Sequence, residues 1–210
     1  MFTAQKILIL APHTDDGELG CGGTIAKFCK EGKEVHYVAF STCEKSLPAE
    51  MAPDTLEQEC KTAVKELGMD PGRLMFFDFE VRIFFQKRQE ILEEMVSLNK
   101  SIQPDLVLIP SASDSHQDHQ VIHGEALRAF KKSSILGYEL PWNQNRFTST
   151  LFSTLSKEHI EKKIKAIKVY QSQSQRNYMQ EDFIRSLAKV RGVQCNSEYA
   201  EAFEVYKIIY

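Results

Sequence analysis

The sequence predicts a single α/β domain built on a mostly parallel sheet with helices on both faces. In the first half, short apolar runs alternate with amphipathic stretches, which is the pattern of βαβ units. Residues 106–109 are apolar throughout, as expected of a parallel strand that is buried on both faces. The 210 residues contain no repeat, low-complexity tract or linker, so we expect one Rossmann-like domain over residues 1–210.

The first βαβ unit is expected at the N-terminus. Residues 6–12 contain an apolar run and are predicted as the first strand. Helical spacing of apolar residues begins at Thr24, and Gly32 is a suitable helix end because glycine tolerates the left-handed conformation found there. Residues 35–40 are predicted as the second strand, which completes a right-handed crossover.

The later elements follow from the same signals. Asp54 and Gly68 bracket a predicted helix, as a candidate N-cap and a C-terminal glycine. Residues 41–53 and 111–119 are expected to be loops. The other predicted elements are strands at 74–79, 106–109, 135–140, 149–153 and 202–209, and helices at 86–100, 120–132, 157–170 and 180–190.

Composition and charge exclude several classes of protein. Hydrophobic residues at 42% and charged residues at 26% are a globular balance, not that of a disordered chain. A net charge of −3, without a basic cluster, argues against nucleic acid as a partner. The first apolar run is too short for a membrane span and no cleavage site precedes it, so a cytoplasmic protein is expected. Five scattered cysteines are expected to be free thiols.

Two polar clusters follow the first and fourth predicted strands. The first contains His-Thr-Asp-Asp-Gly-Glu at residues 13–18, and the second contains Asp-Ser-His-Gln-Asp-His at residues 114–119. If both strands are parallel members of one sheet, their carboxyl ends lie at the same edge, where open α/β sheets bind ligands. We therefore expect the two clusters to form one pocket.

The residue types of the clusters suit metal-assisted hydrolysis. A catalytic zinc commonly takes three protein ligands, which His13, Asp16 and one histidine of the second cluster would provide. Asp15 would be available as the base that accepts a proton from the attacking water. His116 could donate a proton to the tetrahedral intermediate or the departing amine, and Asp118 could orient and charge it.

Each of these features has a common structural explanation when taken alone. A histidine at a strand end is often only a hydrogen-bonded loop residue, and an Asp-Asp pair is often a helix cap. Gly20, Gly22 and Gly23 do not complete a dinucleotide-binding fingerprint, because Ile25 stands where its third glycine is required. We expect these glycines to let a loop pass close to the metal site. Three histidines outside the clusters are assigned structural roles: His36, His123 and His159.

Together the clusters resemble the PIG-L/LmbE family of metal-dependent N-deacetylases. The signatures of that family are a His-Pro-Asp-Asp-Glu-type segment near the N-terminus and a later His-x-Asp-His, and the stretch 191–203 is similar as well. Thr14 and Gln117 stand where proline is frequent in the family. Glu18 lies one place later than the usual acidic residue, which leaves its support of the site open.

The resemblance implies a role for each of six residues. They are Zn²⁺ ligands at His13, Asp16 and His119, a general base at Asp15, and support of the oxyanion or leaving amine by His116 paired with Asp118. The choice of His119 over His116 as a ligand comes from the resemblance alone. Fe²⁺ also accepts two histidines and one carboxylate, so it is the alternative metal.

The resemblance also implies a hydrolase that removes the N-acetyl group of an N-acetylglucosamine-type conjugate. An alternative is the same chemistry on a non-sugar N-acyl amide. A non-catalytic carbohydrate- or nucleotide-binding module is a third hypothesis, although it would need neither a base nor a proton donor. The expected partner is a small molecule, and a homo-oligomer is possible. No residue is assigned to substrate binding, because four candidates have ordinary structural explanations: Arg82, Arg191, Tyr138 and Trp142.

Overall fold

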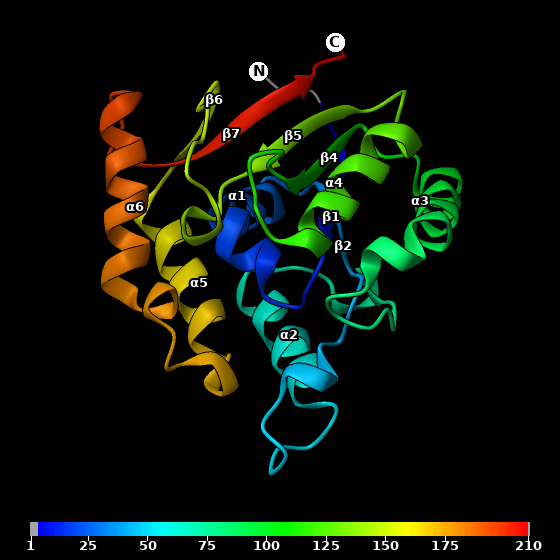
Figure 1. Ribbon diagram of the computed structural model, residues 1–210. Helices are drawn as coiled ribbons and strands as arrows, with labels where there is room; N and C mark the ends of the chain where they lie inside the picture. The colour runs from blue at the N-terminus through cyan, green and yellow to red at the C-terminus, as the bar shows by residue number, and fades with distance from the viewer. Residues whose placement is uncertain (1–3, 210) are drawn as a thin grey trace.

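The computed structural model describes residues 4–209 and contains a seven-stranded sheet (Figure 1). The strands are β1 (Lys6–Ala11), β2 (Glu34–Ala39), β3 (Leu74–Phe76), β4 (Leu106–Pro110), β5 (Ser134–Tyr138), β6 (Leu151–Leu155) and β7 (Tyr199–Lys207). The α-helices are α1 (Asp16–Lys30), α2 (Thr55–Glu66), α3 (Arg88–Ile102), α4 (Gln117–Ala129), α5 (Lys157–Lys168) and α6 (Glu181–Gln194). Short 3₁₀ helices lie at Glu44–Ser46, Pro71–Arg73, Phe84–Lys87, Pro141–Asn143, Gln171–Gln173 and Asn177–Met179.

The sheet is mostly parallel, which confirms the predicted fold class. Its order is β3-β2-β1-β4-β5-β7-β6, and adjacent strands are parallel from β3 to β5. Strand β7 is antiparallel to both of its neighbours, β5 and β6. The strand order reverses between β1 and β4. The carboxyl ends of those two strands therefore form the crevice in which such sheets bind ligands.

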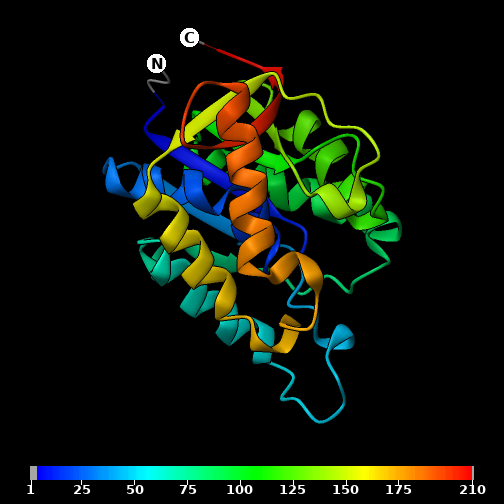
Figure 2. The same ribbon diagram turned by 90° about the vertical axis from the view of Figure 1, so that its left-hand side faces the viewer.

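Successive side chains of β1 enter two different cores. Ile7 and Ile9 are fully buried in the cluster that contains residues of α1, α2, α5 and α6. Leu8 and Leu10 are fully buried in the cluster that contains residues of α3 and α4. This alternation is the period of two that a strand imposes on its side chains. Figure 2 shows α5 and α6 together over one side of the sheet, and the predicted helices on both faces are confirmed.

Helix α1 begins at Asp16, well before the start predicted at Thr24. Its backbone leaves helical values at Cys21, where φ is −145° and ψ is 22°, so it consists of two helical segments. Residues of the first cluster therefore lie in the first turn of a helix. The many glycines in residues 17–23 concealed this segment, since glycine is unfavourable in a helix interior.

The glycines of α1 serve close packing of the helix against the sheet. A Cβ atom at Gly17 would lie 2.4 Å from the Tyr37 ring, and one at Gly20 would lie 2.3 Å from the Tyr138 ring. Only glycine fits at such a distance. The expectation that the glycines of residues 20–23 let a loop pass the metal site is therefore wrong, because these residues are helical.

A buried ion pair satisfies the backbone at the break in α1. The Lys163 ammonium donates to the Leu19 carbonyl at 2.7 Å and to Glu201 Oε1 at 2.7 Å. The Glu201 carboxylate accepts hydrogen bonds from the Gly23 N–H at 2.9 Å and the Thr24 N–H at 2.7 Å. The pair thus caps the end of the first helical segment and the start of the second. Without it, backbone C=O and N–H groups at the break would lack hydrogen-bond partners.

Lys163→Met is expected to lower the free energy of unfolding by about 3–5 kcal/mol, because Glu201 would stay buried without its counter-charge. Urea unfolding of both proteins measures the difference. Lys165→Met, at an exposed position of the same helix, is the matched control and should change stability by less than about 0.5 kcal/mol. A loss no larger than that of the control would show that the ion pair does not stabilise the fold.

Helix α4 begins inside the segment that was predicted as a loop over residues 111–119. His116 occupies the N-cap position, and its Nδ1 accepts the Asp118 N–H at 3.2 Å. Histidine is not among the usual capping residues, so the sequence carries little signal for this start. As a result, Asp118 and His119 lie on the first turn of a helix, not in a flexible loop.

Further expectations from the sequence concern the cysteines, membrane-spanning segments, location and oligomeric state. All five cysteines are free, as predicted. Over residues 4–209, no helix combines the length and the apolar character that crossing a bilayer requires. The expected cytoplasmic location and homo-oligomer stay predictions.

Candidate active site

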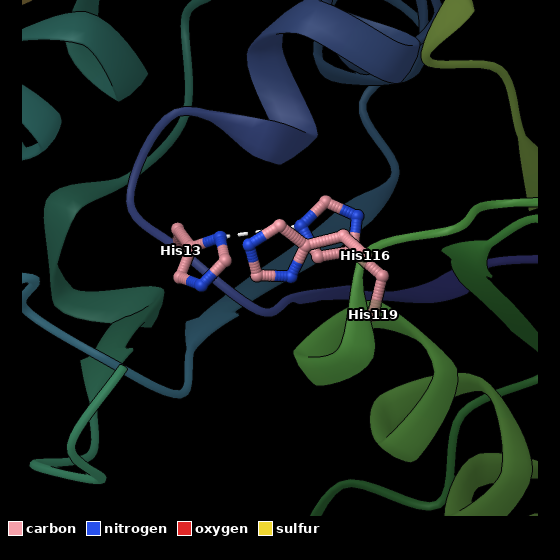
Figure 3. Close-up of side chains that lie close together, drawn as sticks. All are labelled: His13, His116 and His119. Carbon is pink, nitrogen blue, oxygen red and sulfur yellow. Dashed lines mark hydrogen bonds between the residues drawn. The ribbon is translucent and has the colours of Figure 1, made fainter. Parts of the chain in front are cut away.

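The two polar clusters meet at the carboxyl edge of the sheet. Strands β1 and β4 are adjacent and parallel, so the segment after β1 faces the first turn of α4. Figure 3 shows the rings of His13, His116 and His119 close together at this place. The cluster opens onto a pocket of about 220 Å³, which is lined by five of the six predicted site residues: His13, Asp15, Asp16, His116 and His119.

Three of these side chains bring one atom each to a common point. His13 Nδ1 lies 3.1 Å from Asp16 Oδ2 and 3.2 Å from His119 Nε2, and Asp16 Oδ2 lies 3.3 Å from His119 Nε2. Ligands bound at about 2.0–2.1 Å in a tetrahedron lie about 3.3 Å from one another. The separations of these three atoms suit a small cation. The three imidazoles form a looser group, with nitrogens within 4.8 Å of one another.

Asp118 orients His13. Its Oδ2 accepts from the Arg82 N–H at 2.7 Å and lies 3.1 Å from His13 Nε2. In the neutral ring that binds a metal, a proton on Nε2 satisfies this contact and leaves the Nδ1 lone pair facing Asp16. The sequence led us to expect that Asp118 orients and charges His116. The Asp118 carboxylate contacts the ring of His13, and only the Asp118 N–H contacts the His116 ring, so the pairing of Asp118 with His116 stays a prediction.

His119 is held in the same manner by Asp114. Asp114 Oδ2 lies 2.7 Å from His119 Nδ1, and Asp114 Oδ1 accepts from the His116 N–H at 2.8 Å. A proton on Nδ1 again leaves the second nitrogen, Nε2, facing the common point. Asp114 was not among the site residues predicted from the sequence. Its position five residues before His119 is a weak signal, since many carboxylates could reach a histidine.

His116 differs from His13 and His119 in the group that it offers to the site. Its Nδ1 accepts from the Asp118 N–H at 3.2 Å, so the neutral ring carries its proton on Nε2. Burial and the neighbouring His119 and His13 lower the pKa of His116 to about 4, which favours this neutral form. His116 therefore has a donor, not a free lone pair, to offer to the pocket.

The two adjacent carboxyl groups are in different electrostatic environments. Burial and the nearby Asp16 raise the pKa of Asp15 to about 6. Burial opposes ionisation of Asp16 too. Without a bound metal, Asp16 raises the pKa of His13 and of His119, and the positive charges of the protonated rings outweigh burial and hold the pKa of Asp16 well below its usual range. Asp16 is thus a permanent anion, whereas Asp15 has the proton affinity that suits a base near neutral pH.

Glu18 supports the backbone of the first cluster. It is fully buried and accepts from the hydroxyls of Tyr37 at 2.5 Å and Tyr170 at 2.9 Å. Both hydroxyls also contact the Thr14 carbonyl, at 3.0 Å and 2.7 Å. Burial raises the pKa of Glu18 to about 8. Glu18 and the two tyrosines thus hold the peptide between His13 and Asp15. Glu18 supports the site in this way although it lies one place later in the sequence than the usual acidic residue of the family.

The rim of the pocket comes from segments that lie far apart in the sequence. Trp142 and Tyr178 stack with ring centroids 4.0 Å apart at an angle of 10°. Of the four candidate contacts from the sequence, Arg82 and Trp142 line the pocket. Arg191 pairs with Glu139, and the buried Tyr138 donates to the Leu10 carbonyl, so these two are structural. Several further lining residues were not predicted from the sequence, among them Asn143, Arg176 and Tyr178.

The histidines outside the clusters have the structural roles that were predicted. His36 pairs with Glu34 at 2.8 Å on β2, and His123 Nδ1 lies 2.9 Å from the Pro110 carbonyl. His159 forms a capping box with Ser156 at the start of α5. None of the three lines the pocket.

Comparison with known proteins identifies the family. Residues 8–130 match the family model PIG-L, described as GlcNAc-PI de-N-acetylase, and this segment spans both polar clusters. The chain belongs to the PIG-L family. The resemblance that the two sequence motifs indicated is thereby confirmed. A curated relative of this PIG-L chain is the diacetylchitobiose deacetylase of Thermococcus kodakarensis, 25% identical over 228 residues that cover 94% of this chain and 81% of the relative.

Solved structures share the fold of this PIG-L chain. The N,N'-diacetylchitobiose deacetylase of Pyrococcus horikoshii, in complex with an inhibitor, has a TM-score of 0.81 and 23% identity, with coverage of 97% of this chain and 84% of that one. GalB from Pseudomonas putida, a 4-carboxy-2-hydroxymuconate hydratase, has a TM-score of 0.79 and 22% identity, with coverage of 98% of each chain. Since a deacetylase and a hydratase share it, the fold alone does not decide the reaction.

Proposed function

We propose that this protein is a metal-dependent N-deacetylase that hydrolyses the acetamide of an N-acetylglucosamine-type sugar conjugate. The observation that carries the proposal is the matched orientation of His13 and His119. In each ring one nitrogen contacts a buried carboxylate, and the other faces Asp16. Histidines that bind a metal are commonly oriented in this way by a carboxylate on their second nitrogen.

His13, Asp16 and His119 would hold the metal, and the donor set suits Zn²⁺ or Fe²⁺. His116 is left out of the proposed ligand set. Its Nδ1 accepts the Asp118 N–H, so the neutral ring would carry its proton on the remaining nitrogen, Nε2. When bound, the cation would polarise the scissile carbonyl and make a water molecule more acidic. This choice of ligands differs from a three-histidine set, and the two sets predict different variants to lose metal.

Asp15 and His116 would carry out the proton chemistry. The Asp15 carboxylate would accept a proton from the water as its oxygen bonds to the acetyl carbon. The His116 Nε2–H would donate a hydrogen bond to the negatively charged oxygen of the tetrahedral intermediate. Asp15 would then return its proton to the departing nitrogen as the C–N bond breaks, which yields acetate and the free amine.

The family description and the diacetylchitobiose deacetylase support an acetylated amino sugar as the substrate class. The pocket agrees with this class, since it combines an aromatic wall with polar lining groups, the usual composition of a small-molecule site. To test the function, acetate release from N-acetylglucosamine, its glycosides and simple N-acyl amides is measured with metal-free protein, before and after addition of Zn²⁺ or Fe²⁺. Metal-dependent release from the sugars is expected. Release only from the simple amides would contradict the sugar assignment.

Asp114→Asn is expected to weaken Zn²⁺ binding by about 10–100-fold, because the amide cannot hold the His119 ring as the carboxylate does. Titration against a chelator of known affinity measures the effect without an activity assay. Asp105→Asn is the matched control, since Asp105 accepts the Gln5 and Lys6 N–H groups at the opposite edge of the sheet. Equal affinities in both variants would show that Asp114 does not orient a ligand.

A further inference from the structure

Gln173 is a buried polar side chain in the wall of the proposed active site. It is 4% exposed and lines the pocket that contains His13 and Asp15, but the proposed reaction gives it no role. The nitrogen and the oxygen of a buried amide both need hydrogen-bond partners, because an unpaired polar group in the protein interior is unfavourable. The partners of these two atoms therefore indicate what the side chain does.

A chain of hydrogen bonds from α2 fixes the orientation of the Gln173 amide. Ser172 donates its N–H to Glu59 Oε1 at 3.0 Å and its hydroxyl to Glu59 Oε2 at 2.5 Å. Since the carboxylate takes the only hydroxyl proton, Ser172 Oγ can only accept a hydrogen bond from Gln173, at 3.1 Å. The atom that faces Ser172 is therefore Nε2 of Gln173, and Oε1 occupies the other branch of the amide.

The Gln173 side-chain oxygen is left for a ligand. Among residues 4–209, no group donates a hydrogen bond to Oε1, and the protein does not seal this atom from solvent. The pocket therefore offers a hydrogen-bond acceptor in a fixed position. A hydroxyl or an N–H group can satisfy this acceptor, whereas an ionised carboxylate has no proton to donate.

The segment that carries Gln173 is tied to the reaction centre. The Gln173 N–H donates to the Tyr170 carbonyl at 3.0 Å, and the Tyr170 hydroxyl donates to the Thr14 carbonyl at 2.7 Å. Thr14 lies between His13 and Asp15 in the sequence. Thr14 and Gln173 line the same pocket of about 220 Å³, so a small substrate with its acetamide at the proposed metal site lies within reach of Gln173.

We propose that Gln173 accepts a hydrogen bond from a ring hydroxyl of the substrate and thereby selects sugars that carry this hydroxyl. Glu59 and Ser172 are positioning residues, because they hold the amide with its oxygen toward the pocket. A site that hydrogen-bonds a hydroxyl discriminates against an analogue without it, since the acceptor then stays unpaired. The inference rests on the proposed deacetylase function and adds a specificity-determining residue to it.

The test compares the methyl β-glycoside of N-acetylglucosamine with its 3-deoxy, 4-deoxy and 6-deoxy analogues. For Zn²⁺-loaded protein, kcat/KM for one analogue is expected to be at least about fivefold lower than for the parent glycoside, and that analogue identifies the hydroxyl. Gln173→Met keeps the length of the side chain without the carbonyl acceptor, so it should reduce this difference to less than about twofold. Ser172→Ala should reduce the difference in part, because Nε2 loses the group that fixes the orientation of the amide.

Gln171→Met is the matched control and should keep the full difference between the glycosides. Gln171 is exposed, donates to the Lys168 carbonyl and does not line the pocket. Equal kcat/KM for all four glycosides in the wild type would overturn the proposal. So would Gln173→Met activity that falls by one factor on every glycoside, because the discrimination would then not depend on the amide.

If no glycoside releases acetate, the proposed function fails, and binding decides the role of Gln173 separately. Titration calorimetry then measures the affinities of the wild type and Gln173→Met for the four glycosides. A weaker affinity of the wild type for one deoxy analogue, which Gln173→Met abolishes, would support the hydrogen bond. Equal affinities would overturn it.

Discussion

Asp15→Asn is expected to lower kcat by about 10²–10⁴-fold, while the protein still binds one metal ion. The amide has nearly the shape of the carboxylate but cannot accept the proton of the attacking water. Asp15 has no role in the proposed ligand set, since Asp16 provides the carboxylate oxygen near His13 and His119. The measurement is acetate release at saturating substrate, with the metal content of each protein determined in parallel.

The pH dependence gives a second readout for Asp15. Burial and Asp16 raise the pKa of Asp15 to about 6, and only its deprotonated form can act as a base. Activity of the wild type should therefore fall as the pH decreases below about 6, and the residual activity of Asp15→Asn should lack this decrease. Asp182→Asn, at an exposed position in α6, serves as the control. If Asp15→Asn loses its metal together with its activity, Asp15 is a ligand and the proposed division of roles is wrong.

His119→Ala is expected to abolish metal binding and, with it, acetate release. His119 is buried between Asp16 and Asp114, at 3.3 Å and 2.7 Å from their carboxylate oxygens. Its removal takes away one of three ligands and leaves two buried carboxylates without the imidazole between them. Metal content after dialysis, measured by atomic emission, is the readout. His123→Ala is the control, because His123 contacts the Pro110 carbonyl outside the pocket.

His116→Ala distinguishes the two possible ligand sets. In the proposed set, this variant keeps its metal and loses about 10²–10³-fold in kcat, because only the donor to the oxyanion is removed. In a set of three histidines, the same variant would lose metal, and Asp16→Asn would retain it. The opposite behaviour of these two variants therefore tests the ligand assignment directly, whatever substrate is used.

Local features of the sequence determined the fold class and the place of the site. The apolar runs of β1 and β4 and the amphipathic stretches between them were sufficient to predict a parallel sheet. Buried strands and half-buried helices each impose a characteristic spacing of apolar residues on the local sequence. Both clusters follow these strands directly. The sequence could therefore predict that they meet at the carboxyl edge, without knowing any side-chain direction.

The sequence was less informative where a backbone conformation depends on distant contacts. The start of α1 was missed because glycines weaken the helical signal, and their purpose is visible only where Tyr37 and Tyr138 lie against the helix. The break at Cys21 likewise depends on an ion pair between α5 and β7. The position of β7 between β5 and β6 has no signature in local periodicity, since strand pairing is decided across the chain.

Only the tertiary structure decided which groups within the clusters act together. Sequence spacing suggested that Asp118 serves its neighbour His116, whereas its carboxylate contacts the ring of His13 from the other cluster. His119 offers a lone pair to the proposed metal position, whereas His116 offers an N–H donor. Neighbouring positions in a sequence do not encode this difference in hydrogen-bond direction. The rim residues Arg82 and Arg176 meet at one pocket although 94 positions separate them in the chain. The residue types of the site are thus a property of the sequence, and their pairing follows from which segments the folded core brings into contact.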